Sequence, residues 1–278
     1  MSTAGVVGAA LGSALAAAAS SVLQHRSARN APRSIRNATL VAYLLSRPGW
    51  LVGSLCAVVG LVLHAVALAG GRLALVQPLL VSGLLFALPV SVLLEHRRPR
   101  VREWLWAFAV VVGLSAFLLG AHPGAGRSVS HGRELGITTA ACLALIGILV
   151  VVARSAAGAR AALLATAGGL GFGITSALLK QAAGLAAHRP LSALTDWSTY
   201  GLIVVGALAV GLTQVAYRSG RLADALPAMT ISDPASSIFI GVIAFHERVG
   251  TSPAALTVQV LAFVLMTVAA RQVALVDT

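Results

Sequence analysis

The sequence predicts an all-α, polytopic membrane protein with nine transmembrane helices. Of its 278 residues, 58% are hydrophobic and only 10% are charged, and the mean hydropathy is +0.91. Soluble domains carry about 25% charged residues. The apolar residues also gather into runs close to the about 20 residues that a helix needs to cross a bilayer. A soluble fold of this composition would lack enough polar surface, so we expect a multi-pass membrane protein.

Four apolar runs precede the middle of the chain, and a basic linker at 25–47 separates the first from the second. The second and fourth runs open on tryptophans, which are typical anchors at the membrane interface. Within the linker, Val41–Leu45 is too short to span and is read as an interfacial helix. The four predicted spans are about Gly5–Leu23, Trp50–Ala69, Leu73–Leu94 and Trp104–Gly120.

Five further apolar runs follow a polar loop at 122–133. The sixth run of the chain is rich in glycine, which favours close helix packing, as do Gly8 and Gly12 in the first run. The eighth run is interrupted by Asp233-Pro234, and the proline removes a backbone donor and loosens the helix beside the acid. The five predicted spans are about Leu135–Val152, Ala161–Leu185, Trp197–Tyr217, Gly220–Val249 and Ala254–Leu275.

The number of arginines in each loop predicts the orientation of these spans. With the N-terminus outside, the inner segments carry fourteen arginines and the outer segments five. This asymmetry is the one that the positive-inside rule describes. We therefore expect a multi-pass protein of the cell membrane, in a bacterial inner membrane, with the N-terminus outside and the C-terminus inside.

Two copies of one motif indicate an internal repeat. Gly71-Arg72-Leu73-Ala74 has Pro78 six residues after the arginine, and Gly220-Arg221-Leu222-Ala223 has Pro227 at the same offset. The two copies open spans of opposite direction, which predicts two inverted four-helix repeats, spans 1–4 and 6–9, joined by a connector helix. The predicted organisation is 1–120 for the first repeat, 121–153 for the loop and connector span, and 154–278 for the second repeat.

The composition and motifs exclude several classes. The net charge of +12 comes from arginines in short loops without interleaved aromatic residues, so we expect no nucleic-acid partner. Cys56 and Cys142 lie apart in apolar runs, without a metal-binding or disulfide pattern. No phosphate-loop, HExxH or GxSxG motif occurs, and we expect neither an ATP-driven pump, nor an enzyme, nor a cofactor.

Several short motifs together resemble those of the drug/metabolite transporter superfamily (EamA-like). They are Pro48–Gly53 after the basic linker, Val76–Leu79, Gly171–Lys180, Gln214–Pro227 and Phe245–Glu247. Within it, the chain is most similar to the nine-span NIPA-like branch, whose named members are magnesium transporters. The resemblance covers essentially the whole chain and implies a transporter fold. The stretch Gly60–His64 departs from the magnesium branch, which usually carries a glutamate there.

Asp233 and Lys180 are the first candidate functional residues. An acid at membrane depth is expensive and commonly marks a pathway, a pair or a proton relay. Asp233 has two interpretations: coupling or cation recognition in a cavity, or a structural acid paired with Lys180. Lys180 has three: binding an anionic substrate, pairing with Asp233, or extending to the outer interface.

Four further polar residues complete the candidate site, and each has a structural alternative. His64 and Gln214 lie at roughly corresponding places in the two repeats, so they fit a midplane site or hydrogen bonds between helices. Gln77 beside Pro78 lines the path or makes a contact between helices, and Ser236 lines the Asp233 cavity or permits tight packing. Glu95 and Glu247 end their helices and are read as solvated acids.

The sequence therefore predicts a secondary-active transporter that moves a small polar or cationic solute by alternating access. A NIPA-like Mg²⁺ transporter is the alternative within transport, and a non-transporting membrane scaffold or lipid-handling subunit is the alternative of another class. The expected partners are the lipid bilayer and a small-molecule or ion substrate, with a homodimer as an open alternative. Whether any of the candidate residues binds a metal is left open.

Overall fold

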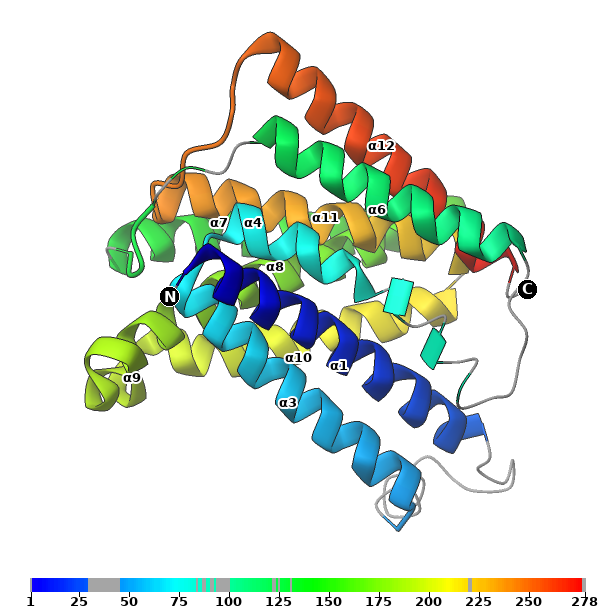
Figure 1. Ribbon diagram of the computed structural model, residues 1–278, viewed down its shortest axis with the longest axis horizontal. Coiled ribbons are helices and arrows are strands. Elements are labelled where there is room, and N and C mark those ends of the chain that lie inside the picture. Colours follow the sequence, from blue (N-terminus) through cyan, green and yellow to red (C-terminus); the bar gives the residue numbers. More distant parts are fainter. Residues whose placement is uncertain are drawn as a thin grey trace.

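Helices make up almost all of the computed structural model (Figure 1). It describes residues 2–29, 46–83, 85, 86, 89, 90, 93, 101–121, 124, 126–130, 132–219 and 222–276. Within these residues β-pairing is limited to one isolated bridge between Gly124 and Arg248. The basic linker from residue 30 to 45, its Val41–Leu45 segment and Glu95 lie outside the described residues.

The observed helices follow the predicted apolar runs within a few residues at most ends. The helices of the first half are α1 (Thr3–Arg29), α3 (Pro48–Gly70), α4 (Leu73–Val81) and α6 (Val101–Ala121). Those that follow are α7 (Gly132–Ser155), α8 (Arg160–His188), the short α9 (Pro190–Thr195), α10 (Trp197–Ser219), α11 (Leu222–Ala244) and α12 (Pro253–Val276). A short 3₁₀ turn, η1 (Ala157–Ala159), joins α7 to α8.

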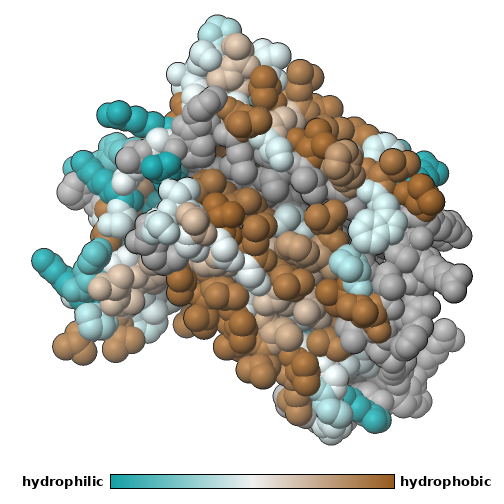
Figure 2. All heavy atoms as spheres, in the orientation of Figure 1, coloured by the Kyte–Doolittle hydropathy of each residue, from teal (hydrophilic) through white to brown (hydrophobic). Residues whose placement is uncertain are grey.

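Six of these helices are long and apolar enough to cross a membrane: α1, α3, α6, α7, α8 and α10. Two shorter apolar stretches, Ile231–Ala244 and Pro253–Ala269, lie in α11 and α12. In Figure 2, hydrophobic side chains cover the middle of the visible face, and hydrophilic ones gather mainly toward its margins. Large apolar side chains are also exposed, among them Leu55, Phe108 and Ile203, as expected of helices that face lipid. The chain is thus a multi-pass helical membrane protein.

The expected course of the eighth span is wrong at its C-terminal end. The sequence favoured a run to Val249, whereas α11 ends at Ala244 and the chain turns there. The backbone of His246 is left-handed (φ 51°) and makes this turn. A hydrogen bond from Glu247 N to the carbonyl of Gly241, at 3.0 Å, closes the turn. Pro234 does not interrupt the helix, since α11 runs through it.

Helix α8 lies at the centre of the bundle and contacts α3, α7, α10 and α11. Around it, α1 packs along α3 and α6 packs along α12, and both pairs run side by side in Figure 1. Ser13 Oγ donates to Gly60 O at 2.8 Å and ties the first pair. In Figure 1 the start of α1 and the end of α12 lie at opposite ends of the bundle. We call the end where α1 begins, α4 begins and α8 and α11 end the N-terminal end.

Candidate functional site

Glu247 and Lys180 form a buried ion pair near the N-terminal end of the bundle. Lys180 belongs to α8, and its side chain is 2% exposed; that of Glu247 is fully enclosed. Lys180 Nζ donates to Glu247 Oε1. A buried charge left without its partner is strongly destabilising, so this pair fixes both segments.

A third element joins the same carboxylate. The backbone N–H of Leu73, the first residue of α4, donates to Glu247 Oε1 at 2.8 Å. Glu247 therefore caps α4, where a negative charge complements the helix dipole. The positive charge of the neighbouring Arg72 repels that of Lys180. The ion pair thus connects the beginning of α4 with α8 and with the segment that follows α11.

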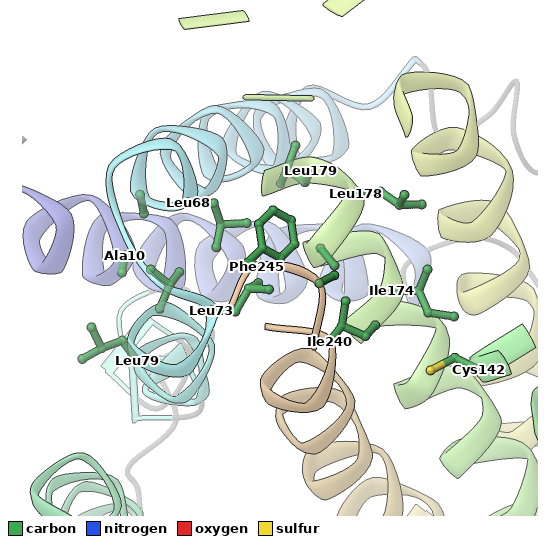
Figure 3. Close-up of a cluster of buried hydrophobic side chains, with 14 of the residues drawn as sticks. Ala10, Leu68, Leu73, Leu79, Cys142, Ile174, Leu178, Leu179, Ile240 and Phe245 are labelled. Carbon is green, nitrogen blue, oxygen red and sulfur yellow. The ribbon is translucent and has the colours of Figure 1, made fainter. Parts of the chain in front are cut away.

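Apolar side chains surround the pair. The ammonium of Lys180 lies 4.7 Å from the centre of the Phe245 ring, an arrangement that favours a cation. Figure 3 shows Phe245 among Leu68, Leu73 and Leu179, with Ile174 and Ile240 farther into the bundle. Water is therefore excluded from the charges on this side, which strengthens their attraction.

The loop between α6 and α7 covers the pair. Gly124 N donates to Arg248 O and Arg127 N donates to Phe245 O, each at 2.7 Å. Gly126 packs so closely that a Cβ atom there would lie 2.7 Å from Glu247 Cγ. Farther along the loop, Ser130 N donates to Gln181 Oε1 at 2.8 Å, next to Lys180 in α8. The loop, α8 and the segment after α11 are therefore joined at this end.

An exposed group of charges lies at the surface of the same region. His246 Nε2 is 3.1 Å from Glu134 Oε2, and Arg127 lies 3.9 Å from the same oxygen. All three side chains are more than a third exposed, so this group contributes little to stability.

Asp233 lies in α11 and has no ion-pair partner among the described residues. Ser237 Oγ donates to Asp233 Oδ1 at a long 3.4 Å. Ser236 Oγ instead donates to the backbone, to Ser232 O at 2.8 Å and to Asp233 O at 3.0 Å. The interpretation of Lys180 as the partner of Asp233 is wrong, because Lys180 pairs with Glu247.

The remaining candidates are dispersed. His64 Nε2 and Gln77 Nε2 are buried without a hydrogen-bond partner in the part of the chain that the structure describes. Gln214 lies on the exposed face of α10. No group of three or more His, Cys, Asp or Glu side chains that could hold a metal occurs among the described residues.

The sequence interpretation missed the role of Glu247. That interpretation places Glu247 in solvent beside Arg248, whereas only 3% of the surface of Glu247 is exposed. Its position after the apolar run suggested a loop at the water interface, whereas the turn at His246 directs the chain back onto the bundle. The available signal was the repeated motif itself, since Arg72-Leu73 opens the helix that Glu247 caps.

Comparison with known proteins assigns the chain a family. No family model matches it, and no solved structure matches it. It is 30% identical to an uncharacterized protein of Corynebacterium glutamicum over 243 residues. These residues cover 86% of this chain and 84% of the relative. Fold and site define a multi-pass helical membrane protein with a buried ion pair. More particularly, the chain belongs to the same family as this corynebacterial protein.

Proposed function

We propose that the protein is a secondary-active transporter of the drug/metabolite type, which moves a small polar or cationic solute by alternating access. The observation that carries the proposal is the buried ion pair between Lys180 and Glu247. Ionisable groups inside a membrane bundle are costly, and they commonly belong to substrate or ion pathways. Because the pair joins α4 with α8 and the end of α11, it lies where two halves of a transporter would meet.

The packing supports an inverted repeat. Gly71, at the end of α3, packs against Val6 at the start of α1, and Glu247 brings α4's first residue to the later part of α8. The first helix of one half therefore begins at the end where the first helix of the other half finishes. Likewise, α3 packs on α1 as α10 packs on α8. This arrangement is the one expected of spans 1–4 and 6–9 in opposite orientation, with α7 as the connector.

In this proposal the N-terminal end of the bundle faces the outside of a bacterial inner membrane. The ion pair and the loop residues 124 and 126–130 then form the closed outer gate. The gate can open in two ways: Glu247 separates from Lys180, or the intact pair separates from the beginning of α4. Asp233, deeper in α11, is our candidate for proton coupling or cation recognition.

The test is solute uptake into proteoliposomes that contain a pH-sensitive dye, with Mg²⁺, amines and amino acids offered outside. Wild type is compared with Asp233→Asn. The control is Asp196→Asn, at a partly exposed acid before α10 that accepts from Ser198 N at 2.9 Å, a bond that the asparagine oxygen can also accept. Solute-dependent proton movement that is lost in Asp233→Asn alone supports the proposal. Mg²⁺ entry without proton movement would instead support the NIPA-like alternative.

A non-transporting scaffold or lipid-handling subunit is the second candidate. The observation that favours it is the filling of the described core by apolar side chains around Phe245 (Figure 3). Absence of movement for every solute, in protein whose fold is verified by its cooperative melting, would favour this candidate.

A further inference from the structure

A cavity of about 510 Å³ lies between α7, α8 and α10, away from the ion pair. Its walls are apolar, with Val150 from α7, Leu164 from α8 and Leu208 and Leu212 from α10. Volumes of 300–1,000 Å³ are typical of cavities that hold small organic molecules. Exposed apolar residues such as Val204 and Val210 flank it on α10, as expected of a helix face that contacts lipid.

Two arginines line the same cavity. Arg154 lies in the last turn of α7, and Arg160 begins α8 across the turn η1. Both are exposed, and no acid among the described residues forms an ion pair with either. They lie where α7 ends and α8 begins, at the end of the bundle opposite the ion pair. One cavity thus combines an apolar interior with two arginines that form no ion pair among the described residues.

We propose that this cavity binds an anionic phospholipid, with an acyl chain between α7 and α10 and the phosphate at Arg154 and Arg160. Charge complementarity selects this occupant. Guanidinium groups bind phosphate oxygens in a bidentate manner, and basic pockets between helices on the cytoplasmic side are typical sites for acidic lipid headgroups. An uncharged lipid would fill the apolar part and leave both arginines without a partner. This inference is independent of the proposed transport.

Gly211 provides a means of filling the cavity without disturbing the fold. It lies on α10 in the cavity wall, and a Cβ atom placed there meets no atom within 4 Å. Gly211→Leu therefore places a side chain in the space that the acyl chain would occupy. Gly147→Leu is its matched control, because Gly147 of α7 is also exposed with no atom within 4 Å but does not line the cavity.

The experiment is native mass spectrometry of the full chain, released from micelles that contain equal amounts of dioleoyl phosphatidylglycerol and dioleoyl phosphatidylcholine. Wild type is expected to retain phosphatidylglycerol preferentially. Each basic residue near an anionic headgroup contributes roughly 1 kcal/mol, so Arg154→Gln and Arg160→Gln should each lower the retention ratio by about fivefold. Arg133→Gln, at the other end of α7, removes the same charge and should leave the ratio unchanged. Gly211→Leu should lower retention of both lipids, and Gly147→Leu should not.

Three outcomes would overturn the proposal. Equal retention of the two lipids by wild type would show that the arginines do not select the headgroup, and so would an unchanged ratio in a variant that combines Arg154→Gln with Arg160→Gln. A dimeric wild type whose dimer is lost in Gly211→Leu, without a change in lipid retention, would assign the cavity to a second copy of the chain. Cooperative melting of every variant in detergent verifies that the comparison is between folded proteins.

Discussion

At the residue scale, Glu247 places one oxygen between two donors that come from distant parts of the chain. It accepts from the ammonium of Lys180 and from the backbone of Leu73. Removal of either charged partner leaves the other buried and alone, whereas removal of both charges relieves that cost. The energetic importance of the pair can therefore be measured by comparing single and double variants.

We expect Glu247→Gln and Lys180→Met each to lower the free energy of unfolding by about 3–5 kcal/mol. The double variant should lose less than the sum of the two, because it contains no unpaired charge and its glutamine still accepts from Leu73 N. The measurement is unfolding by sodium dodecyl sulfate, followed by circular dichroism. Glu134→Gln, in the exposed group with His246 and Arg127, should change stability by at most about 1 kcal/mol. Strictly additive losses would contradict a direct interaction.

The residue scale is also where prediction from sequence was weakest. Hydropathy identified Lys180 and Asp233 as unusual, because each interrupts an apolar run. It did not identify partners, since the choice between Asp233 and Glu247 depends on how far the chain turns after α11. That turn needs a left-handed backbone at His246. This conformation is uncommon for residues other than glycine, so the sequence does not predict it.

At the scale of elements, α8 packs through glycines on two of its faces. A Cβ atom at Gly173 would lie 1.9 Å from Ser236 Oγ and 2.9 Å from the backbone oxygen of Asp233, both in α11. A Cβ at Gly171 would lie 2.8 Å from the Cβ of Ala209 in α10. The helices therefore approach at a distance that small residues alone permit.

We expect Gly173→Ala to destabilise the bundle by about 1–3 kcal/mol through overpacking. Gly147→Ala, where the added methyl meets open space, should be neutral or stabilising by up to about 1 kcal/mol, because alanine favours the helix. Unfolding in sodium dodecyl sulfate measures both. Adding Ser236→Ala to Gly173→Ala should not restore stability, since the backbone of α11 is the second obstacle; full restoration would contradict backbone contact.

Element bounds were the part that sequence predicted best. An apolar run of the length of a bilayer is sufficient to locate α3, α7 and α10 within about a turn. Which glycines pack closely was predicted correctly for α8 and incorrectly for Gly8, which has no neighbouring atom within 4 Å of its Cβ position. Spacing within one helix shows that close approach is possible, but the facing helix decides whether it occurs.

At the scale of the whole molecule, the loop before α7 and the segment before α12 meet across the N-terminal end. Gly124 and Arg248 form a bridge there, and a Cβ atom at Gly124 would lie 2.8 Å from Arg248 Cβ. Disulfides require Cβ atoms about 3.5–4.5 Å apart, so a small separation of the two segments suffices.

We expect Gly124→Cys with Arg248→Cys to cross-link in a chain whose Cys56 and Cys142 are replaced by alanine. If the proposed outer gate opens here, solute uptake should stop on oxidation and return on reduction. Gel mobility after alkylation measures the cross-link, and proteoliposome uptake measures the consequence. Undiminished uptake by fully cross-linked protein would exclude this end as the moving gate.

The topology has its own test, because α11 is not among the six long apolar helices. Ser155 ends α7 and Thr251 precedes α12, and both are exposed. If α8, α10 and α11 all cross the membrane, cysteines at these two positions lie on opposite faces. A membrane-impermeant maleimide applied to intact cells should label Thr251→Cys and not Ser155→Cys. Labelling of both from one face would remove α11 from the set of spans.

The burial of Lys180 also constrains how the protein is made. Its partner Glu247 lies 67 positions later in the chain, so translation at about 5–20 residues per second separates them by roughly 3–13 s. During that interval α8 enters the bilayer with an unpaired cation, and its glycine face toward α11 has no partner until α11 is made. We therefore expect nascent α8 to stay in contact with the insertion machinery until α11 emerges. Chains truncated before Glu247 should be degraded faster than the full chain.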